Sequence, residues 1–233
     1  MIIAKLVLLR HGKSQWNEQN RFTGWTDIGL SEKGYVEAKK VGKFFKKNKF
    51  HFDLAYTSTL NRASDTLIKI LNEINHNHIP IEKSWFLNER HYGALEGLKK
   101  TELIKQYGKK QVNLWRKDFH TIPPKINEND PKYPGNNQKY AHLKKSILPL
   151  GESLYETMKR VIIYWEKTIK PQLKQGKNII IVAHGNSLRT LIKYIDNMNE
   201  TDFFHFYIPN AKPIIYYFFK NMKPIKISYC FQH

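Results

Sequence analysis

The segment that decides the fold covers residues 178–185 and reads Asn-Ile-Ile-Ile-Val-Ala-His-Gly. Its apolar residues follow one another without polar residues between them, which is typical of a strand covered on both faces. A similar run lies at the start of the chain, where the β-prone segment Ile2–Leu9, interrupted by Lys5, ends in Arg10-His11-Gly12. We therefore expect two strands of one sheet, each of which runs into a His-Gly pair.

Segments with helical periodicity alternate with these strands. Apolar residues at helical spacing predict helices from Ser31, an N-cap residue type, to about Asn48, from Ala63 to about Ile74, from Leu154 to a stop near Pro171, and over Ser187–Asn197. A short strand is expected over Phe52–Thr57. This alternation predicts an α/β fold, a three-layer sandwich with a mainly parallel central sheet and helices on both faces.

Residues 119–150 differ from the rest of the chain in composition. Asn and Gly residues separate five prolines, which are Pro123, Pro124, Pro131, Pro134 and Pro149. This composition predicts an inserted, largely irregular flap and not a linker, because neither flanking part looks self-sufficient. We expect a single domain over residues 1–233 that carries this insertion.

The formal net charge of +19 suggests an anionic partner. The proportion of Lys to Arg indicates which kind of partner to expect. The chain has 32 Lys and only 7 Arg. A surface built for nucleic-acid phosphates usually uses more Arg, whose planar fork matches phosphate oxygens. The lysines are dispersed through predicted helices and loops, so we expect no nucleic-acid partner.

Cysteine usage and apolar run lengths indicate the compartment. The lone Cys230 excludes a disulfide framework. No apolar run approaches the roughly 18 residues of a membrane span. We expect a soluble, cytoplasmic protein with no membrane partner.

Polar side chains follow the ends of the predicted strands. Because the carboxyl ends of parallel strands share one edge, His11 and His184 could face each other across a site there. A neutral imidazole is a good phosphoryl acceptor near pH 7, and fixed cations around it would stabilise the transferring group. Arg10 lies beside His11, and Arg62 begins the helix after Phe52–Thr57. The alternative is that these are ordinary loop histidines and a solvated helix charge.

Glu89 lies in the segment Leu-Asn-Glu-Arg-His-Tyr-Gly at residues 87–93 and is a candidate general acid or base. A structural ion pair with a nearby Arg is the alternative role. Catalytic metal binding is not expected, because no His pair with ligand spacing has a carboxylate near it, and His76 and His78 lie in a polar turn. The chain has neither a Walker loop nor a Gly-rich dinucleotide fingerprint.

An ordered set of motifs from about Lys5 to Lys226 resembles the cofactor-dependent phosphoglycerate mutases of the histidine phosphatase superfamily. The motifs are residues 10–12 (Arg-His-Gly), 14–17 (Ser-Gln-Trp-Asn), 21–25 (Arg-Phe-Thr-Gly-Trp), 30–34 (Leu-Ser-Glu-Lys-Gly), 56–58 (Tyr-Thr-Ser), 88–93 (Asn-Glu-Arg-His-Tyr-Gly), 133–135 (Tyr-Pro-Gly) and 183–189 (Ala-His-Gly-Asn-Ser-Leu-Arg). The resemblance implies interconversion of 3-phosphoglycerate and 2-phosphoglycerate in glycolysis and gluconeogenesis. It implies a phosphohistidine at His11, 2,3-bisphosphoglycerate as the phosphoryl primer, no metal, and a homo-oligomer, most often a dimer.

The resemblance also assigns residue roles. The catalytic residues that it implies are His11, Glu89, His184, Arg10 and Arg62. The substrate-binding residues that it implies are Arg10, Ser14, Asn17, Thr23, Gly24, Arg62, Glu89, Arg90, Tyr92, Lys100, Arg116, Lys117, Gly185 and Asn186.

Three departures from the family pattern qualify these roles. Lys13 stands where the family usually has Glu, and we expect an extra positive charge near the pocket mouth. Lys117 stands where the family usually has Arg, which removes a bidentate fork and predicts weaker substrate binding. The chain stops at His233 where family members usually continue with a mobile tail, so we expect a more open site that loses phosphoryl groups faster to water.

Two other functions stay open at this point. A phosphatase with the same histidine nucleophile, acting on a small phosphorylated metabolite, is the nearest rival. The long segment between Glu89 and His184, with its basic residues and flap, favours the mutase. A basic nucleic-acid-binding protein is the remote alternative.

Overall fold

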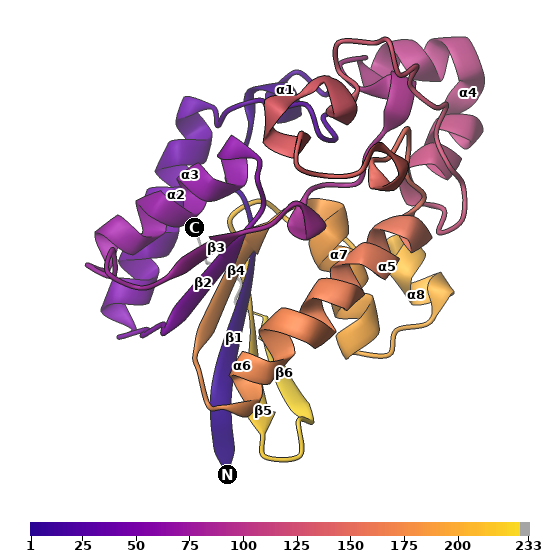
Figure 1. Ribbon diagram of the computed structural model, residues 1–233. Helices are drawn as coiled ribbons and strands as arrows, with labels where there is room; N and C mark the ends of the chain where they lie inside the picture. The colour runs from indigo at the N-terminus through magenta and orange to yellow at the C-terminus, as the bar shows by residue number, and fades with distance from the viewer. Residues whose placement is uncertain (229–233) are drawn as a thin grey trace.

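The computed structural model describes residues 1–228, and it contains a six-stranded sheet at its centre (Figure 1). The strands are β1 (Ile2–Arg10), β2 (Leu54–Thr57), β3 (Ile81–Lys83), β4 (Ile179–Ala183), β5 (Pro213–Phe219) and β6 (Pro224–Ser228). Their order in the sheet is β3-β2-β4-β1-β5-β6. The first four strands in that order are parallel, and β5 and β6 are antiparallel to their neighbours. The predicted mainly parallel sheet is confirmed.

Strand β4 lies between β1 and β2, and all five of its residues are fully buried. Its unbroken apolar sequence therefore has the two-sided cover that the pattern predicts. Arg10 and Ala183 are register partners, and the backbone N–H of His11 donates to the carbonyl of Ala183 at 3.0 Å. The two His-Gly pairs consequently lie side by side at the carboxyl edge of the sheet.

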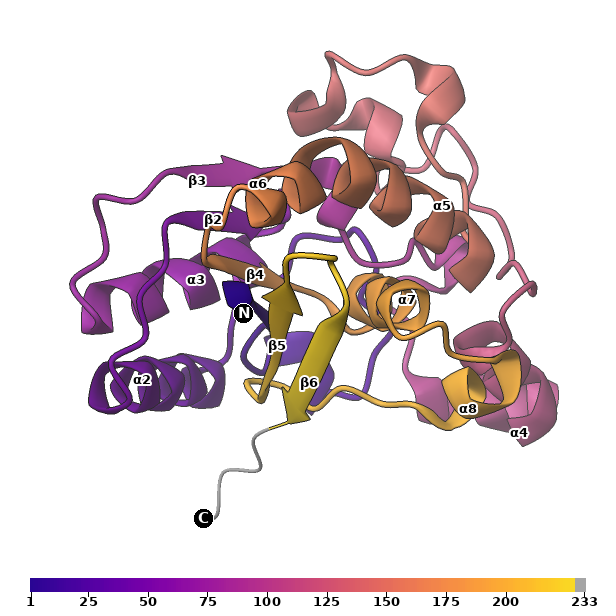
Figure 2. The ribbon, with the colours of Figure 1, turned by 90° about the horizontal axis from the view of Figure 1, so that it is seen from below.

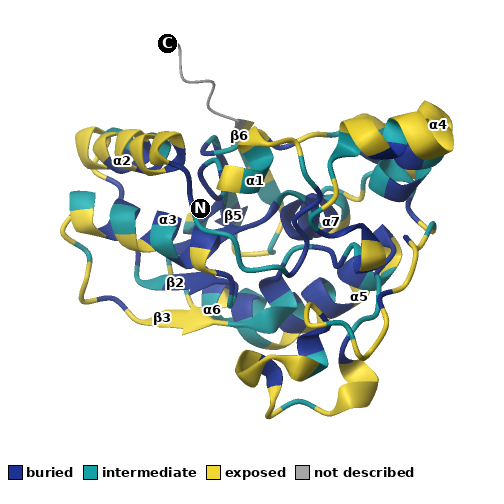
Figure 3. Ribbon diagram, turned by 90° about the horizontal axis from the view of Figure 1, so that it is seen from above, coloured by how far each residue is buried: buried dark blue, intermediate teal, exposed yellow. Residues whose placement is uncertain are grey.

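Two helical layers cover the two faces of the sheet (Figure 2). One layer is α2 (Glu32–Lys47) and α3 (Asn61–Glu73), whose apolar stripes pack on Val7 and Ile180. The other contains α5 (Leu154–Tyr164), α6 (Lys170–Lys174) and α7 (Gly185–Ile195). The predicted three-layer sandwich is confirmed, and the expected helices match α2, α3, α5 and α7 to within a few residues. Figure 3 shows buried residues on β2 and α7, whereas the edge strand β3 is exposed.

The third expected helix ends near Pro171, at Lys174, but the proline is not what ends it. The chain passes from α5 through a π-helical turn (Trp165–Ile169) directly into α6, which contains Pro171 in its first turn. Proline is tolerated there, because the first turn of a helix leaves its N–H groups without intrahelical partners. The wider turn thus lets the helical segment continue to Lys174.

Several elements were not expected. They are α1 (Gln15–Glu18), the 3₁₀ helices at Trp85–Leu87 and Gly93–Leu95, α4 (Lys100–Lys117), α8 (Glu200–His205), the edge strand β3 and the strand β5. Helix α4 bends at Gly108, whose φ of 78° lies in the left-handed region. Its first and last residues can therefore face the same space.

Residues 119–150 contain only short 3₁₀ helices, at Pro134–Asn136, Gln138–Tyr140 and Lys145–Ile147. Apolar side chains of this segment, among them Tyr133, Tyr140 and Leu148, pack against Trp25. The segment thus has its own small core beside the site. Cys230 and the end of the chain, on which two expectations rest, lie outside the described residues. Among the residues that the structure describes, no helix is long and apolar enough to cross a membrane.

Candidate active site

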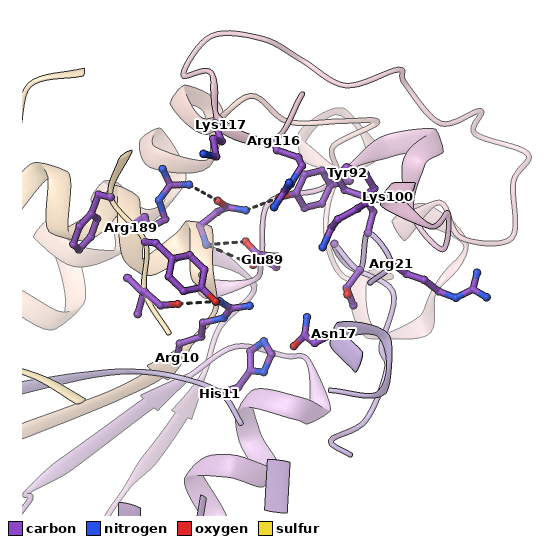
Figure 4. A pocket seen from close by; sticks show the side chains of 18 of the residues that line it. Arg10, His11, Asn17, Arg21, Glu89, Tyr92, Lys100, Arg116, Lys117 and Arg189 are labelled. Atoms are coloured by element: carbon purple, nitrogen blue, oxygen red, sulfur yellow. Dashed lines mark hydrogen bonds between the residues drawn. The ribbon is translucent and has the colours of Figure 1, made fainter. Parts of the chain in front are cut away.

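A cavity of about 360 Å³ opens at the carboxyl edge of β1 and β4 (Figure 4). The sequence-predicted residues that line it are Arg10, His11, Asn17, Thr23, Gly24, Arg62, Glu89, Tyr92, Lys100, Arg116, Lys117, Gly185 and Asn186. These residues come from β1, α1, α3, α4, α7 and the loops between them. The fold thus gathers, at one edge of the sheet, side chains that are up to 176 positions apart in sequence (Arg10 and Asn186).

His11 lies at the floor of the cavity and is only 3% exposed. Its Nδ1 lies 2.6 Å from the carbonyl oxygen of Gly12. Because a carbonyl only accepts, Nδ1 must carry the hydrogen, and Nε2 keeps the free lone pair. Burial, followed by the charges of Arg62 and Arg10, holds the pKa of His11 well below its usual 6.5. The ring is therefore neutral at pH 7, with one nitrogen ready to act as a nucleophile.

His184 does not line the cavity but lies directly against His11. The two ring centroids are 5.0 Å apart at an interplanar angle of 63°, and His184 Nε2 is 2.7 Å from Oγ of Ser58. Burial and the charge of Arg62 hold the pKa of His184 well below 6.5. His184 is therefore neutral at pH 7 and adds no third positive charge to the pair formed by Arg10 and Arg62.

Two guanidinium groups flank His11, and backbone carbonyls hold both. Arg62 is 1% exposed and donates to the carbonyls of Gly24 at 2.7 Å and Thr26 at 3.0 Å. The φ of Gly24 is 59°, and a Cβ there would collide with the Glu96 carboxylate, so this turn requires glycine. Arg10 donates to the carbonyl of Ile208 at 2.9 Å.

Neither Arg10 nor Arg62 has a carboxylate partner within ion-pair distance among the described residues. The Nε atom of each arginine is buried and has no hydrogen-bond partner among residues 1–228. Burial lowers the pKa of Arg62, because a buried charge loses its hydration. Two cations without an ion-pair partner among residues 1–228, beside a neutral histidine, can bind the oxygens of a phosphoryl group.

Glu89 faces the cavity from the loop before α4. Its Oε1 accepts from the backbone N–H of Arg90 at 2.8 Å and from that of Asn186 at 3.1 Å. No Arg, Lys or His side chain of residues 1–228 forms an ion pair with it. The carboxylate is thus oriented by backbone amides and stays available for proton transfer.

A second set of cations lies at the rim of the cavity, at the two ends of the bent helix α4. Burial, with the charges of Arg116 and Arg10, lowers the pKa of Lys100 to about 8. The Nζ of Lys117 lies 5.3 Å from the centre of the Phe204 ring, a cation–π contact. Figure 4 shows Lys100, Arg116 and Lys117 on the side of the cavity opposite His11.

Two predicted substrate-binding residues lie behind the cavity wall. Ser14 caps α1, where its Oγ accepts from the N–H of Asn17 at 3.2 Å, so it orients a lining residue. Arg90 is fully buried and donates to the carbonyls of Glu152 at 2.6 Å and Thr121 at 2.8 Å. Lys13, expected near the mouth, is also absent from the lining residues.

The cavity has lining residues that the sequence did not point to. They are Arg21, Phe22, Arg189 and the run Phe204–Ile208. Arg21, Phe22 and Arg189 lie within recognised motifs, which were a usable signal. The run Phe204–Ile208 covers the end of α8 and the start of the loop that leads to β5, and it has no motif. Its Tyr207 hydroxyl accepts from Arg10 at 3.1 Å. Within residues 1–228, no group of three or more His, Cys, Asp or Glu side chains could hold a metal ion.

Comparison with known proteins identifies the family of this chain. The model of the histidine phosphatase superfamily (branch 1) matches residues 6–226. A 2,3-bisphosphoglycerate-dependent phosphoglycerate mutase of Hamiltonella defensa subsp. Acyrthosiphon pisum (strain 5AT) is 52% identical over 229 residues, which cover 98% of this chain and 92% of the relative.

Solved structures share the fold at low sequence identity. The alpha-ribazole phosphatase of Shigella flexneri superposes with a TM-score of 0.70 at 22% identity, over 94% of this chain and 92% of that one. A phosphoserine phosphatase of Entamoeba histolytica, solved in complex with 3-phosphoglyceric acid, gives a TM-score of 0.65 at 23% identity, over 98% of each chain. By its family match and by its identity to a curated member, this chain belongs to the histidine phosphatase superfamily.

Proposed function

We propose that the protein interconverts 3-phosphoglycerate and 2-phosphoglycerate through a phosphohistidine at His11. The observation that supports this function is that one cavity contains two separate clusters of cationic side chains. Arg10 and Arg62 flank a neutral nucleophile at the floor, and Lys100, Arg116 and Lys117 stand at the rim. A ligand with a phosphate at one end and a carboxylate or second phosphate at the other end matches this arrangement. The 52% identical mutase supports the same substrate.

The residues divide the chemistry between them. His11 Nε2 attacks phosphorus as the bond from phosphorus to the donor oxygen breaks, and the phosphoryl group then passes from His11 to the free hydroxyl of a monophosphoglycerate. Glu89 takes the proton of that hydroxyl and returns a proton in the reverse step. Arg10 and Arg62 stabilise the charge on the transferring oxygens.

The primer 2,3-bisphosphoglycerate would supply, when bound, the phosphoryl group that first loads His11. The chain's residues fit it, because the floor offers buried guanidinium nitrogens without partners and the rim offers three more cations. We also propose, from the family resemblance, a homodimer in the cytoplasm. Analytical ultracentrifugation at micromolar concentration would show a mass near twice that of one chain.

A single assay tests the proposed function. We would supply 3-phosphoglycerate with and without catalytic 2,3-bisphosphoglycerate, and follow 2-phosphoglycerate and free phosphate together. We expect 2-phosphoglycerate to form, at a rate that rises with the bisphosphate, and to exceed the free phosphate. Release of phosphate without isomerisation would overturn the mutase in favour of a phosphatase on small phosphorylated metabolites.

A further inference from the structure

Arg189 is a charged residue of the cavity wall that the proposed mechanism leaves without a task. It lies on α7, is 7% exposed, and has no carboxylate partner among the described residues. Its Nη2 donates to the carbonyl of Phe203 at 2.7 Å, and its guanidinium carbon lies 4.6 Å from the centre of the Phe203 ring. These contacts fix the guanidinium against α8.

The other terminal nitrogen of Arg189 faces the cavity side. Nη1 donates to Oδ1 of Asn186 at 3.1 Å, and Nδ2 of Asn186 donates to the hydroxyl of Tyr92 at 2.9 Å. Figure 4 shows Arg189 and Tyr92 along the wall of the cavity, with Glu89 beside them. Asn186 and Tyr92 both line the cavity.

The direction of this chain of hydrogen bonds follows from chemistry. An amide side chain can turn over and exchange its oxygen and nitrogen, but an arginine has donors only. Asn186 must therefore present its oxygen to Arg189, which leaves its NH₂ group for Tyr92. The Tyr92 oxygen then accepts, and its own hydrogen remains free to donate. Burial raises the pKa of Tyr92 above 10, so that hydrogen is retained at neutral pH.

We propose that Arg189 is a positioning residue for ligand binding, because it orients the Asn186 amide so that Tyr92 donates its hydroxyl hydrogen to an anionic group of the ligand. Each member of the chain donates to the next, and such aligned bonds strengthen one another. Without Arg189, Asn186 can turn its oxygen to Tyr92 and take up the hydrogen that the ligand needs. This inference rests on the proposed function only in requiring an anionic ligand.

A double-mutant cycle on the full-length protein tests the proposal, with Tyr92→Phe, Arg189→Met and the double variant. The readouts are KM for 3-phosphoglycerate and its Kd by calorimetry. We expect Tyr92→Phe to weaken binding about tenfold, as for a lost hydrogen bond to a charged group. Arg189→Met should raise KM and Kd about five- to tenfold, because the hydrogen bond from Tyr92 to the ligand is then lost in most molecules. The Kd of the double variant should lie within about twofold of that of the single variant that binds more weakly, because both substitutions remove the same interaction with the ligand.

Lys193→Met is the matched control. Lys193 lies one turn further along α7, packs on the same Phe203 ring at 5.6 Å, and donates to a backbone carbonyl, but it makes no hydrogen bond to Asn186. We expect its KM to stay within about twofold of the wild type. Arg189→Lys keeps a donor and should recover most of the binding that Arg189→Met loses. If Arg189→Met unfolds, Arg189→Leu, which also lacks a donor, takes its place in the cycle.

The outcomes separate the two proposals. A wild-type protein that does not isomerise 3-phosphoglycerate overturns the proposed function. An active wild type with losses that multiply in the double variant, or an Arg189→Met variant that binds as tightly as the wild type, overturns the role of Arg189. A loss in Lys193→Met equal to that in Arg189→Met would assign the effect to packing on Phe203 and overturn it as well.

Discussion

The floor and the rim of the cavity hold their charged and polar groups in different ways. The floor consists of His11 with Arg10 and Arg62, and hydrogen bonds to the carbonyls of Gly12, Ile208, Gly24 and Thr26 fix these side chains. His11 and Arg62 are at most 3% exposed. The rim, which consists of Lys100, Arg116 and Lys117, is half-buried. Lys100 and Lys117 contact aromatic rings at 5.6 and 5.3 Å.

This difference indicates a division of labour. Phosphoryl transfer needs donors and nucleophile at fixed positions, since little reorganisation can then oppose the transition state. The long side chains of the rim form no ion pair within residues 1–228, so they can instead adjust to a carboxylate or to a second phosphate of the ligand. Substitutions at the floor should therefore change kcat, and substitutions at the rim should change KM.

The most severe test of the floor is His11→Asn. Since the Nε2 lone pair is the phosphoryl acceptor, isomerisation should fall by at least about 10³-fold and no acid-labile phosphoprotein should form. A coupled enolase assay and labelling with radioactive 2,3-bisphosphoglycerate measure the two effects. His142→Asn, at an exposed position in the flap, is the control and should keep full activity. A labelled His11→Asn protein would place the nucleophile elsewhere.

Arg62→Lys and Arg116→Lys make the same substitution at the floor and at the rim. At the floor, lysine keeps the charge but loses the fork that bonds Gly24 and Thr26, so kcat should fall about 10²-fold. At the rim, KM should rise several-fold, while kcat stays within about twofold. Steady-state kinetics on both variants gives the comparison. Equal losses of kcat would show that floor and rim do not differ in the proposed way.

The sequence predicted the sheet and its main helices because buried strands and amphipathic helices have strong local patterns. Residues 178–183 have no polar residue inside the apolar run, and α2 shows its buried stripe at regular spacing. The π-helical turn before Pro171 could not be predicted, because proline usually ends a helix and only the packed structure allows the wider turn. Helix α4 was missed since a glycine in the left-handed region divides its pattern.

The residues of the site likewise include some that the sequence predicted and some that it did not. Its floor was predictable because each residue follows a strand end or lies in a motif, as His11 and Arg62 do. The run Phe204–Ile208 was not, because it contributes backbone and aromatic groups that have no sequence signature. The neutrality of His184 could not be predicted either, because it depends on burial and on the charge of Arg62, which is distant in the sequence.

The pH dependence of kcat/KM tests the floor and the rim separately. The lowered pKa of His11 keeps the nucleophile neutral below pH 6.5, so the acid limb of kcat/KM should lie below that value. Lys100 is charged below its pKa of about 8 and neutral above it, so kcat/KM should fall about tenfold between pH 7 and pH 9. Lys100→Arg, whose charge persists, should move only the alkaline limb upward. An unmoved alkaline limb would assign that titration to another group.

Lys117→Arg should produce the smallest effect. Arginine can present two parallel N–H donors to a carboxylate or phosphate, whereas Lys117 offers one flexible ammonium group that rests on the Phe204 ring. We therefore expect KM for 3-phosphoglycerate to fall about two- to fivefold with kcat nearly unchanged, because a rim contact improves binding without altering the transfer step. Lys110→Arg, exposed on the same helix, is the control. An unchanged KM in Lys117→Arg would mean that this rim position does not contact the ligand, and the rim would then consist of Lys100 and Arg116 alone.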